Sequence, residues 1–164
     1  MPVRITFGEK YWDEEKQSWD VQRTSSPDAP MFPNDSILEP KSNWRYVNYI
    51  VWVAMAEECG ITAWLINNET GIIRDNESDV VKPLTENDYR IVNEAYLLRS
   101  AFAEGRPGWN MDDDELKIES KELGTLPRIA ATPYDQYLAR LMWLRFWLRW
   151  ALDNCSEPSV VVSW

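Results

Sequence analysis

The segment LARLMWLRFWLRW, residues 138–150, is apolar on two sides of a helix and therefore decides the fold. Successive residues of a helix are rotated by about 100°. One side then carries an aliphatic stripe of Tyr137, Leu141, Leu144, Leu148 and Leu152. The opposite side carries an aromatic stripe of Trp143, Phe146, Trp147 and Trp150. A helix that is apolar on both sides is usually enclosed by other elements, so a central position is predicted.

The aromatic stripe has two interpretations that the sequence leaves open. In the first, it packs on a sheet or on the Pro-rich segment 24–43 and belongs to the core. In the second, Trp143, Trp147 and Trp150 are partly exposed and bind a partner or a second copy of the chain. Aromatic residues beside arginines dominate the energetics of many interfaces, which is the basis of the second interpretation.

The N-terminal part predicts strands followed by a helix. Residues 3–7 alternate, with Val3, Ile5 and Phe7 on one face of a strand. Residues 9–23 fit either a second strand or a short helix, and segment 24–43 is an irregular connection with four prolines. Residues 43–59 are predicted to form a helix, because apolar residues recur at helical spacing. These residues are Tyr46, Val47, Ile50, Val51 and Ala54.

Capping signals mark the ends of the predicted helices. The first begins at Ser42 or Asn43 and stops at Gly60. In the second, Thr85 and Asp88 resemble a capping box, and the helix runs to about Ala103. Its predicted buried stripe is Ile91, Ala95, Leu98 and Phe102.

The remaining segments complete an α+β fold of three main helices and a small antiparallel sheet. Residues 61–74 are a hairpin candidate with a turn rich in Asn and closed by Gly71. The last helix is predicted to begin at Thr132 and Pro133 and to end near Asp153. The chain closes with a predicted strand, VVVSW.

The length of 164 residues predicts a single domain over residues 1–164. The hydrophobic fraction of 45% is enough to form a core, which argues against a disordered chain. Residues 104–131 are interpreted as an acidic insertion that forms a loop or a short helix.

The formal charge of −10 is unevenly distributed. Residues 1–60 hold 6 basic and 10 acidic side chains, residues 61–122 hold 7 and 14, and residues 123–164 hold 4 and 3. Such a field repels nucleic acid and attracts basic surfaces. The predicted partner is therefore a protein with a basic or nucleic-acid-binding surface, and direct nucleic-acid binding is not expected.

The chain has no histidine and two separate cysteines, Cys59 and Cys155, which excludes several chemistries. Catalytic triads that use histidine are absent, and a zinc site is not expected without a CxxC pair. No phosphate-binding glycine motif or nucleophile elbow is present. The prediction is a protein that is not an enzyme and needs no cofactor. Without an apolar signal core or a membrane span, a cytoplasmic location with no membrane contact is expected.

The densest acidic cluster is Asp112, Asp113, Asp114 and Glu115. Three interpretations remain: a divalent cation site, an acidic docking patch for a partner, or a solvated helix start. The pattern lacks the alternating ligands and the glycine of an EF-hand, which argues against the cation. Acidic residues also suit a helix N-terminus without any binding role.

The order of elements resembles that of the ArdB/KlcA antirestriction proteins of mobile elements. The resemblance is carried by AEECGITAWLINNETG, residues 56–71, and by LRFWLRWALDNCSEPSVVV, residues 144–162. It covers about half of the chain, and no functional residue is carried over. It implies a small protein without a catalytic site that acts against host defence.

The predicted function is that of a small acidic inhibitor of the anti-defence type, in the antirestriction or anti-CRISPR class. It would block a host protein complex that handles nucleic acid, either as a nucleic-acid mimic or by steric exclusion. One alternative is an immunity protein that neutralises a basic toxin. The other is a self-assembling protein whose tryptophan stripe forms a homodimer or larger oligomer.

Overall fold

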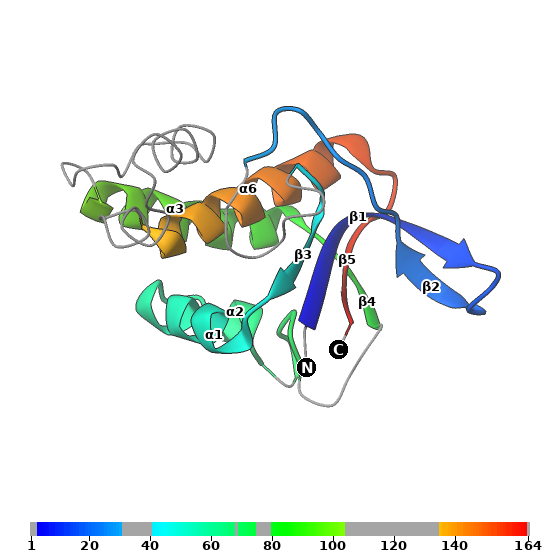
Figure 1. Ribbon diagram of the computed structural model, residues 1–164, viewed down its shortest axis with the longest axis horizontal. Coiled ribbons are helices and arrows are strands. Elements are labelled where there is room, and N and C mark those ends of the chain that lie inside the picture. Colours follow the sequence, from blue (N-terminus) through cyan, green and yellow to red (C-terminus); the bar gives the residue numbers. More distant parts are fainter. Residues whose placement is uncertain (1–2, 31–40, 68, 75–79, 104–134, 164) are drawn as a thin grey trace, which may run out of the picture.

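The predicted α+β class is confirmed. The computed structural model describes residues 3–30, 41–67, 69–74, 80–103 and 135–163. Their elements are, in chain order, β1 (Val3–Asp13), β2 (Ser18–Val21), β3 (Trp44–Val47), α1 (Tyr49–Glu58), α2 (Thr62–Leu65), β4 (Val80–Pro83), α3 (Glu86–Ala103), α6 (Gln136–Asn154) and β5 (Pro158–Ser163). In Figure 1 the helices gather on one side of an antiparallel sheet, and the β1–β2 hairpin points away from them.

Strand β1 organises the sheet because it pairs with three other strands. Residues 3–6 of β1 pair with β3, residues 4–9 pair with β5, and residues 10–13 pair with β2, all antiparallel. Strand β4 pairs with the other side of β5. The sheet also curls, which brings β2 close to β4 and β5. The second-strand interpretation of residues 9–23 is therefore correct.

Helix α6 lies against the sheet on one side and against α3 on the other, which explains its two apolar stripes. Val3, Ile5 and Phe7 line the helix-facing side of β1 and are each 0% exposed, as predicted. The side chain of Asp135 caps α6 by accepting hydrogen bonds from Tyr137 N and Leu138 N, each 3.0 Å long. The end at Asn154 and the closing strand β5 match the predictions. The predicted start at residues 132–133 lies outside the described residues.

The helix predicted over residues 43–59 begins later, because residues 44–47 form strand β3. Its N-cap is Asn48 rather than Ser42 or Asn43, and Asn48 Oδ1 accepts from Val51 N at 3.5 Å. The predicted end is correct: Gly60 follows the last turn with a φ of 72°, a conformation that favours glycine. The buried side chains of α1 are Trp52, Met55 and Ala56, so the apolar residues at helical spacing, such as Ile50 at 79% exposed, do not mark its buried face.

The hairpin predicted over residues 61–74 is wrong in its first half. Residues 62–65 form the short helix α2, and Ile66 and Ile73 meet in an isolated parallel bridge. The turn at Asn67 is present, since its side chain accepts from Glu69 N and Thr70 N. Gly71 is required there because an added Cβ would strike the backbone of Asn67.

Helix α3 has the predicted capping box but presents a different face to the core. Thr85 N donates to Asp88 Oδ2 at 2.7 Å, as expected for the box. Val92 and Ala95 are buried, whereas Leu98 and Phe102 are 74% and 61% exposed. The predicted stripe of Ile91, Ala95, Leu98 and Phe102 is therefore wrong for its last two members. Among the described residues, no helix is long and apolar enough to cross a membrane.

Candidate functional site

Trp143 and Trp147 are core residues, which corrects their predicted role in partner binding. Both are 0% exposed, and a side chain without exposed surface cannot contact a partner while the fold is intact. The ring of Trp143 meets those of Phe7 and Trp52, with centroids 5.6 and 6.4 Å apart. Its Nε1 donates to Ser42 O at 3.3 Å. The first interpretation of the aromatic stripe is thus correct for these two residues.

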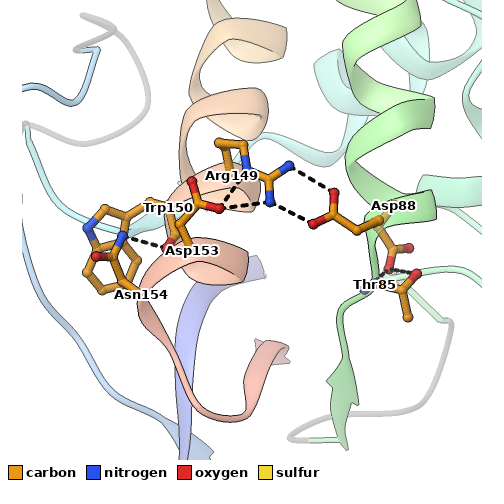
Figure 2. A network of polar contacts seen from close by, with 7 residues as sticks. Thr85, Asp88, Arg149, Trp150, Asp153 and Asn154 are labelled. Atoms are coloured by element: carbon orange, nitrogen blue, oxygen red, sulfur yellow. Dashed lines mark hydrogen bonds and ion pairs between the residues drawn. The ribbon is translucent and has the colours of Figure 1, made fainter.

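Trp150 differs from the other two because it is only partly buried. Its ring meets the ring of Trp147 edge-on, with centroids 5.1 Å apart. The backbone carbonyl of Trp150 accepts from the side chain of Asn154 at 2.9 Å (Figure 2). A role of Trp150 in partner binding stays a prediction.

The arginines beside the aromatic stripe face α3 rather than a partner. Arg149 donates to both oxygens of Glu86 at 2.9 and 2.7 Å and also to Asp153 at 2.9 Å (Figure 2). Its guanidinium lies 4.7 Å from the centroid of the Tyr89 ring. Arg145 lies likewise over Tyr96 at 4.4 Å. These contacts fix α6 against α3.

The Arg149–Glu86 pair predicts a pH-dependent stability. Hydrogen bonds from Arg149 lower the pKa of Glu86 below its usual 4.5. A lowered pKa stabilises the fold above the unfolded-state pKa, and this contribution is lost as the pH falls through the folded-state pKa. We expect Glu86→Gln to lower the melting temperature slightly near about pH 7 and to have no effect near about pH 2. Melting curves across this range measure it, and a difference that does not depend on pH would contradict the assignment.

The two buried carboxylates of the described residues have structural roles. Asp88 accepts from Trp64 Nε1 at 2.9 Å as well as from Thr85. Asp135 caps α6 and binds Arg99 Nε at 2.7 Å, and the same guanidinium lies 3.6 Å from Glu58. Asp135 and Arg99 therefore tie α1, α3 and α6 together, and both carboxylates are already engaged.

Burial makes both thiols poor nucleophiles. It raises the pKa of Cys59 and, together with Glu9, raises the pKa of Cys155 from its usual 9.0 to about 11. Both cysteines are free. Within the described ranges, no three His, Cys, Asp or Glu residues are grouped so that they could hold a metal ion.

The raised pKa of Cys155 predicts slow thiol–disulfide exchange with an added disulfide reagent. At about pH 8, a thiol of pKa about 11 has about 100-fold less thiolate than a thiol of pKa 9.0. Each thiolate is more nucleophilic when its pKa is higher, which offsets part of this loss. The net reaction rate should therefore be about tenfold lower. Ellman's reagent should therefore react with the folded Cys59→Ser variant about tenfold more slowly than with the same variant in urea. Equal rates in the two states would show that the thiol is not protected.

The acidic cluster Asp112, Asp113, Asp114 and Glu115 lies outside the described residues. The described residues carry 15 acidic and 13 basic side chains, a net charge of −2 out of −10 for the chain. The remaining −8 belongs to segments 31–40, 75–79 and 104–134. The described scaffold is therefore nearly neutral, and an acidic docking role for residues 112–115 stays a prediction.

The most prominent exposed aromatic surface lies on the β1–β2 hairpin. Trp12 and Trp19 are directly opposite in the register, with ring centroids 5.3 Å apart in an edge-to-face arrangement. They are 41% and 45% exposed, and Lys10 Nζ lies 4.4 Å from the centroid of the Trp19 ring. Neither tryptophan was among the predicted binding residues. The sequence feature that could have predicted this pair is the equal distance of the two tryptophans from the polar turn at residues 14–17.

A second exposed apolar surface lies on α3. Leu97, Leu98 and Phe102 are 54%, 74% and 61% exposed. Arg99 covers part of Phe102, with its guanidinium 4.5 Å from the ring centroid. This surface lies directly before segment 104–134, whose residues are not described.

Comparison of the chain with protein-family models, curated proteins and solved structures found no match. The resemblance to the ArdB/KlcA family therefore stays a prediction. The candidate site is the hairpin surface, together with the acidic segments 31–40, 75–79 and 104–134, which lie outside the described residues.

Proposed function

We propose that the chain is an acidic binding protein without catalytic activity, which inhibits a protein complex that handles nucleic acid by binding to its basic surface. An anti-defence role, of the antirestriction or anti-CRISPR type, is the setting that suits this chemistry. The partner is recognised by its positive charge, which complements a chain of net charge −10.

The proposal rests on the distribution of charge: the described helices and strands carry little net charge, whereas the segments between them carry most of the negative charge. The helices and sheet use many of their carboxylates internally, as caps or as partners of arginines, and are nearly neutral. The excess of acidic side chains belongs to three segments that connect these elements, and the densest cluster is residues 112–115. Connecting segments held by a packed scaffold are where binding residues concentrate.

The self-assembly alternative loses the surface on which it was based. It required Trp143 and Trp147 to be exposed, and both are buried. The immunity-protein alternative uses the same acidic surface toward a basic toxin, so it differs in the identity of the partner rather than in the chemistry of binding.

The experiment is a pull-down from a host lysate with the full tagged chain at moderate and high salt. The test variant is D112N/D113N/D114N/E115Q. Its matched control removes the same number of charges from exposed positions of the scaffold, as E57Q/E69Q/E94Q/E157Q. Capture of a basic nucleic-acid-handling protein that is lost at high salt and in the test variant, but kept by the control, supports the proposal. Capture of nucleic acid alone, or of the chain itself alone, contradicts it.

A further inference from the structure

The β1–β2 hairpin extends beyond the support of the rest of the sheet. Strand β5 accompanies β1 as far as Glu9, and Lys10 N still donates to Glu157 O at 3.2 Å, so residues 11–13 pair with β2 alone. Figure 1 shows this ribbon pointing away from the helices. A two-stranded ribbon is marginally stable, and cross-strand aromatic pairs such as Trp12 and Trp19 stabilise it. Both rings nevertheless keep more than two fifths of their surface exposed.

Acidic side chains lie at the turn next to this aromatic pair. Residues 13–20 contain four carboxylates, Asp13, Glu14, Glu15 and Asp20, against the single cation of Lys16. Glu14 and Glu15 are exposed at the turn. Asp13 and Asp20 lie on the other face of the ribbon, because side chains alternate along a strand. They share that face with Tyr11, whose pKa is raised by partial burial and further by these two charges. The hairpin therefore presents an aromatic face next to a turn with two exposed carboxylates.

The same combination of groups binds arginine elsewhere in this chain. Arg149 stacks on Tyr89 and pairs with Glu86, and Arg99 lies 5.3 Å from the ring centroid of Tyr137 while it pairs with Asp135. A planar guanidinium suits this arrangement because it stacks on a ring and donates two hydrogen bonds to a carboxylate. The hairpin exposes the rings of Trp12 and Trp19 on one face and the carboxylates of Glu14 and Glu15 at its turn.

We propose that the hairpin is a docking element for an arginine-bearing surface of a protein partner, with Trp12 and Trp19 stacking on guanidinium groups and the carboxylates of Glu14 and Glu15 at the turn pairing with them. The inference rests on the proposed function and assigns part of its contact surface. The position of Lys10 over Trp19 shows that this ring already attracts a cation. A nucleic-acid strand is disfavoured, because its phosphates would meet the exposed carboxylates of Glu14 and Glu15.

The test uses the full chain and an octa-arginine peptide as the probe. Its dissociation constant is measured by calorimetry, and the indole N–H signals of Trp12 and Trp19 are followed by NMR after assignment with single Trp→Phe variants. We expect both signals to shift on binding. The dissociation constant should rise about tenfold in W12A/W19A, and octa-lysine should bind more weakly than octa-arginine. The matched control L98A/F102A removes exposed apolar surface from α3 and should bind as the wild type does.

A second variant is needed because W12A/W19A could weaken binding by destabilising the hairpin itself. E14K/E15K changes only exposed side chains of the turn and leaves the tryptophan pair in place, so it should weaken octa-arginine binding without changing the amide spectrum of the strands. The inference is overturned if neither W12A/W19A nor E14K/E15K weakens binding, if the two indole signals stay in place, or if oligothymidine shifts them instead. The failure of this inference can be distinguished from failure of the proposed function. If W12A/W19A captures the partner from the lysate as well as the wild type does, the proposed function stands and the hairpin is not part of the contact surface.

Discussion

Trp143→Ala is expected to lower the free energy of unfolding by about 3–5 kcal/mol, the range found for truncation of a fully buried tryptophan. The ring fills the space between α6, the first strand and α1, where it meets Phe7 and Trp52. The guanidinium of Arg45 also lies 5.4 Å from its centroid. Truncation leaves a cavity among side chains that are each 0% exposed. Urea denaturation followed by circular dichroism measures the effect.

Two controls separate packing from the other contributions of this residue. Trp12→Ala removes a ring of the same size that is 41% exposed, so it should cost clearly less. Trp143→Phe should cost more than Trp147→Phe, because Trp143 Nε1 donates to Ser42 O whereas Trp147 Nε1 is buried without a hydrogen-bond partner among the described residues. A Trp143→Ala variant that kept its stability would restore the interpretation of this stripe as an interface.

The central helix was predictable because its pattern is long and strongly periodic. Nineteen residues place leucines and aromatics on opposite sides, and such a helix has to be enclosed whatever its neighbours are. The capping box at Thr85 and the stop at Gly60 were predictable for a local reason, since each depends on residues within one turn. The sequence alone did not distinguish a buried from an exposed aromatic stripe, because exposure depends on what packs against the helix.

Strand β3 was not predictable because its signal is too short. Four residues, WRYV, allow both a helical and an alternating pattern, and the apolar residues that follow extend the helical one. The strand also buries Arg45 completely, where it donates to Ser42 and to the carbonyl of Trp44 at 2.8 Å. A buried arginine contradicts the usual assignment of charged residues to the surface.

The face of α3 and the hairpin surface depended on long-range contacts. Arg145 and Arg149 attract Tyr96 and Tyr89, which turns Val92 rather than Leu98 into the core. Hydrophobicity alone ranks a leucine above a tyrosine for burial, so it selected the wrong face. For the hairpin, the residues were evident but the register that pairs Trp12 with Trp19 was not.

Asn43→Ala is expected to destabilise the fold by about 2–4 kcal/mol, although it removes only a small polar side chain. The residue is 0% exposed and lies where two segments meet the edge of β1. Its Nδ2 donates to Phe7 O at 2.6 Å and to Gln22 O at 2.8 Å, and its Oδ1 accepts from Thr24 N at 2.8 Å. Truncation leaves these three backbone groups unpaired in a site with limited access to water.

The site around Asn43 also explains Gly8. A Cβ on Gly8 would lie 3.0 Å from Asn43 Nδ2 and 3.1 Å from Gln22 O, so any side chain there would displace the asparagine. Asn43→Asp keeps the acceptor for Thr24 N but replaces the two donated hydrogen bonds with a carboxylate oxygen facing two carbonyls, and it should destabilise at least as much as Asn43→Ala. The control is Asn87→Ala, since Asn87 bonds only exposed Arg90 among the described residues and should cost less than about 0.5 kcal/mol. Equal stability of Asn43→Ala and Asn87→Ala in urea would mean that the junction of β1, β2 and β3 is held by its backbone hydrogen bonds alone.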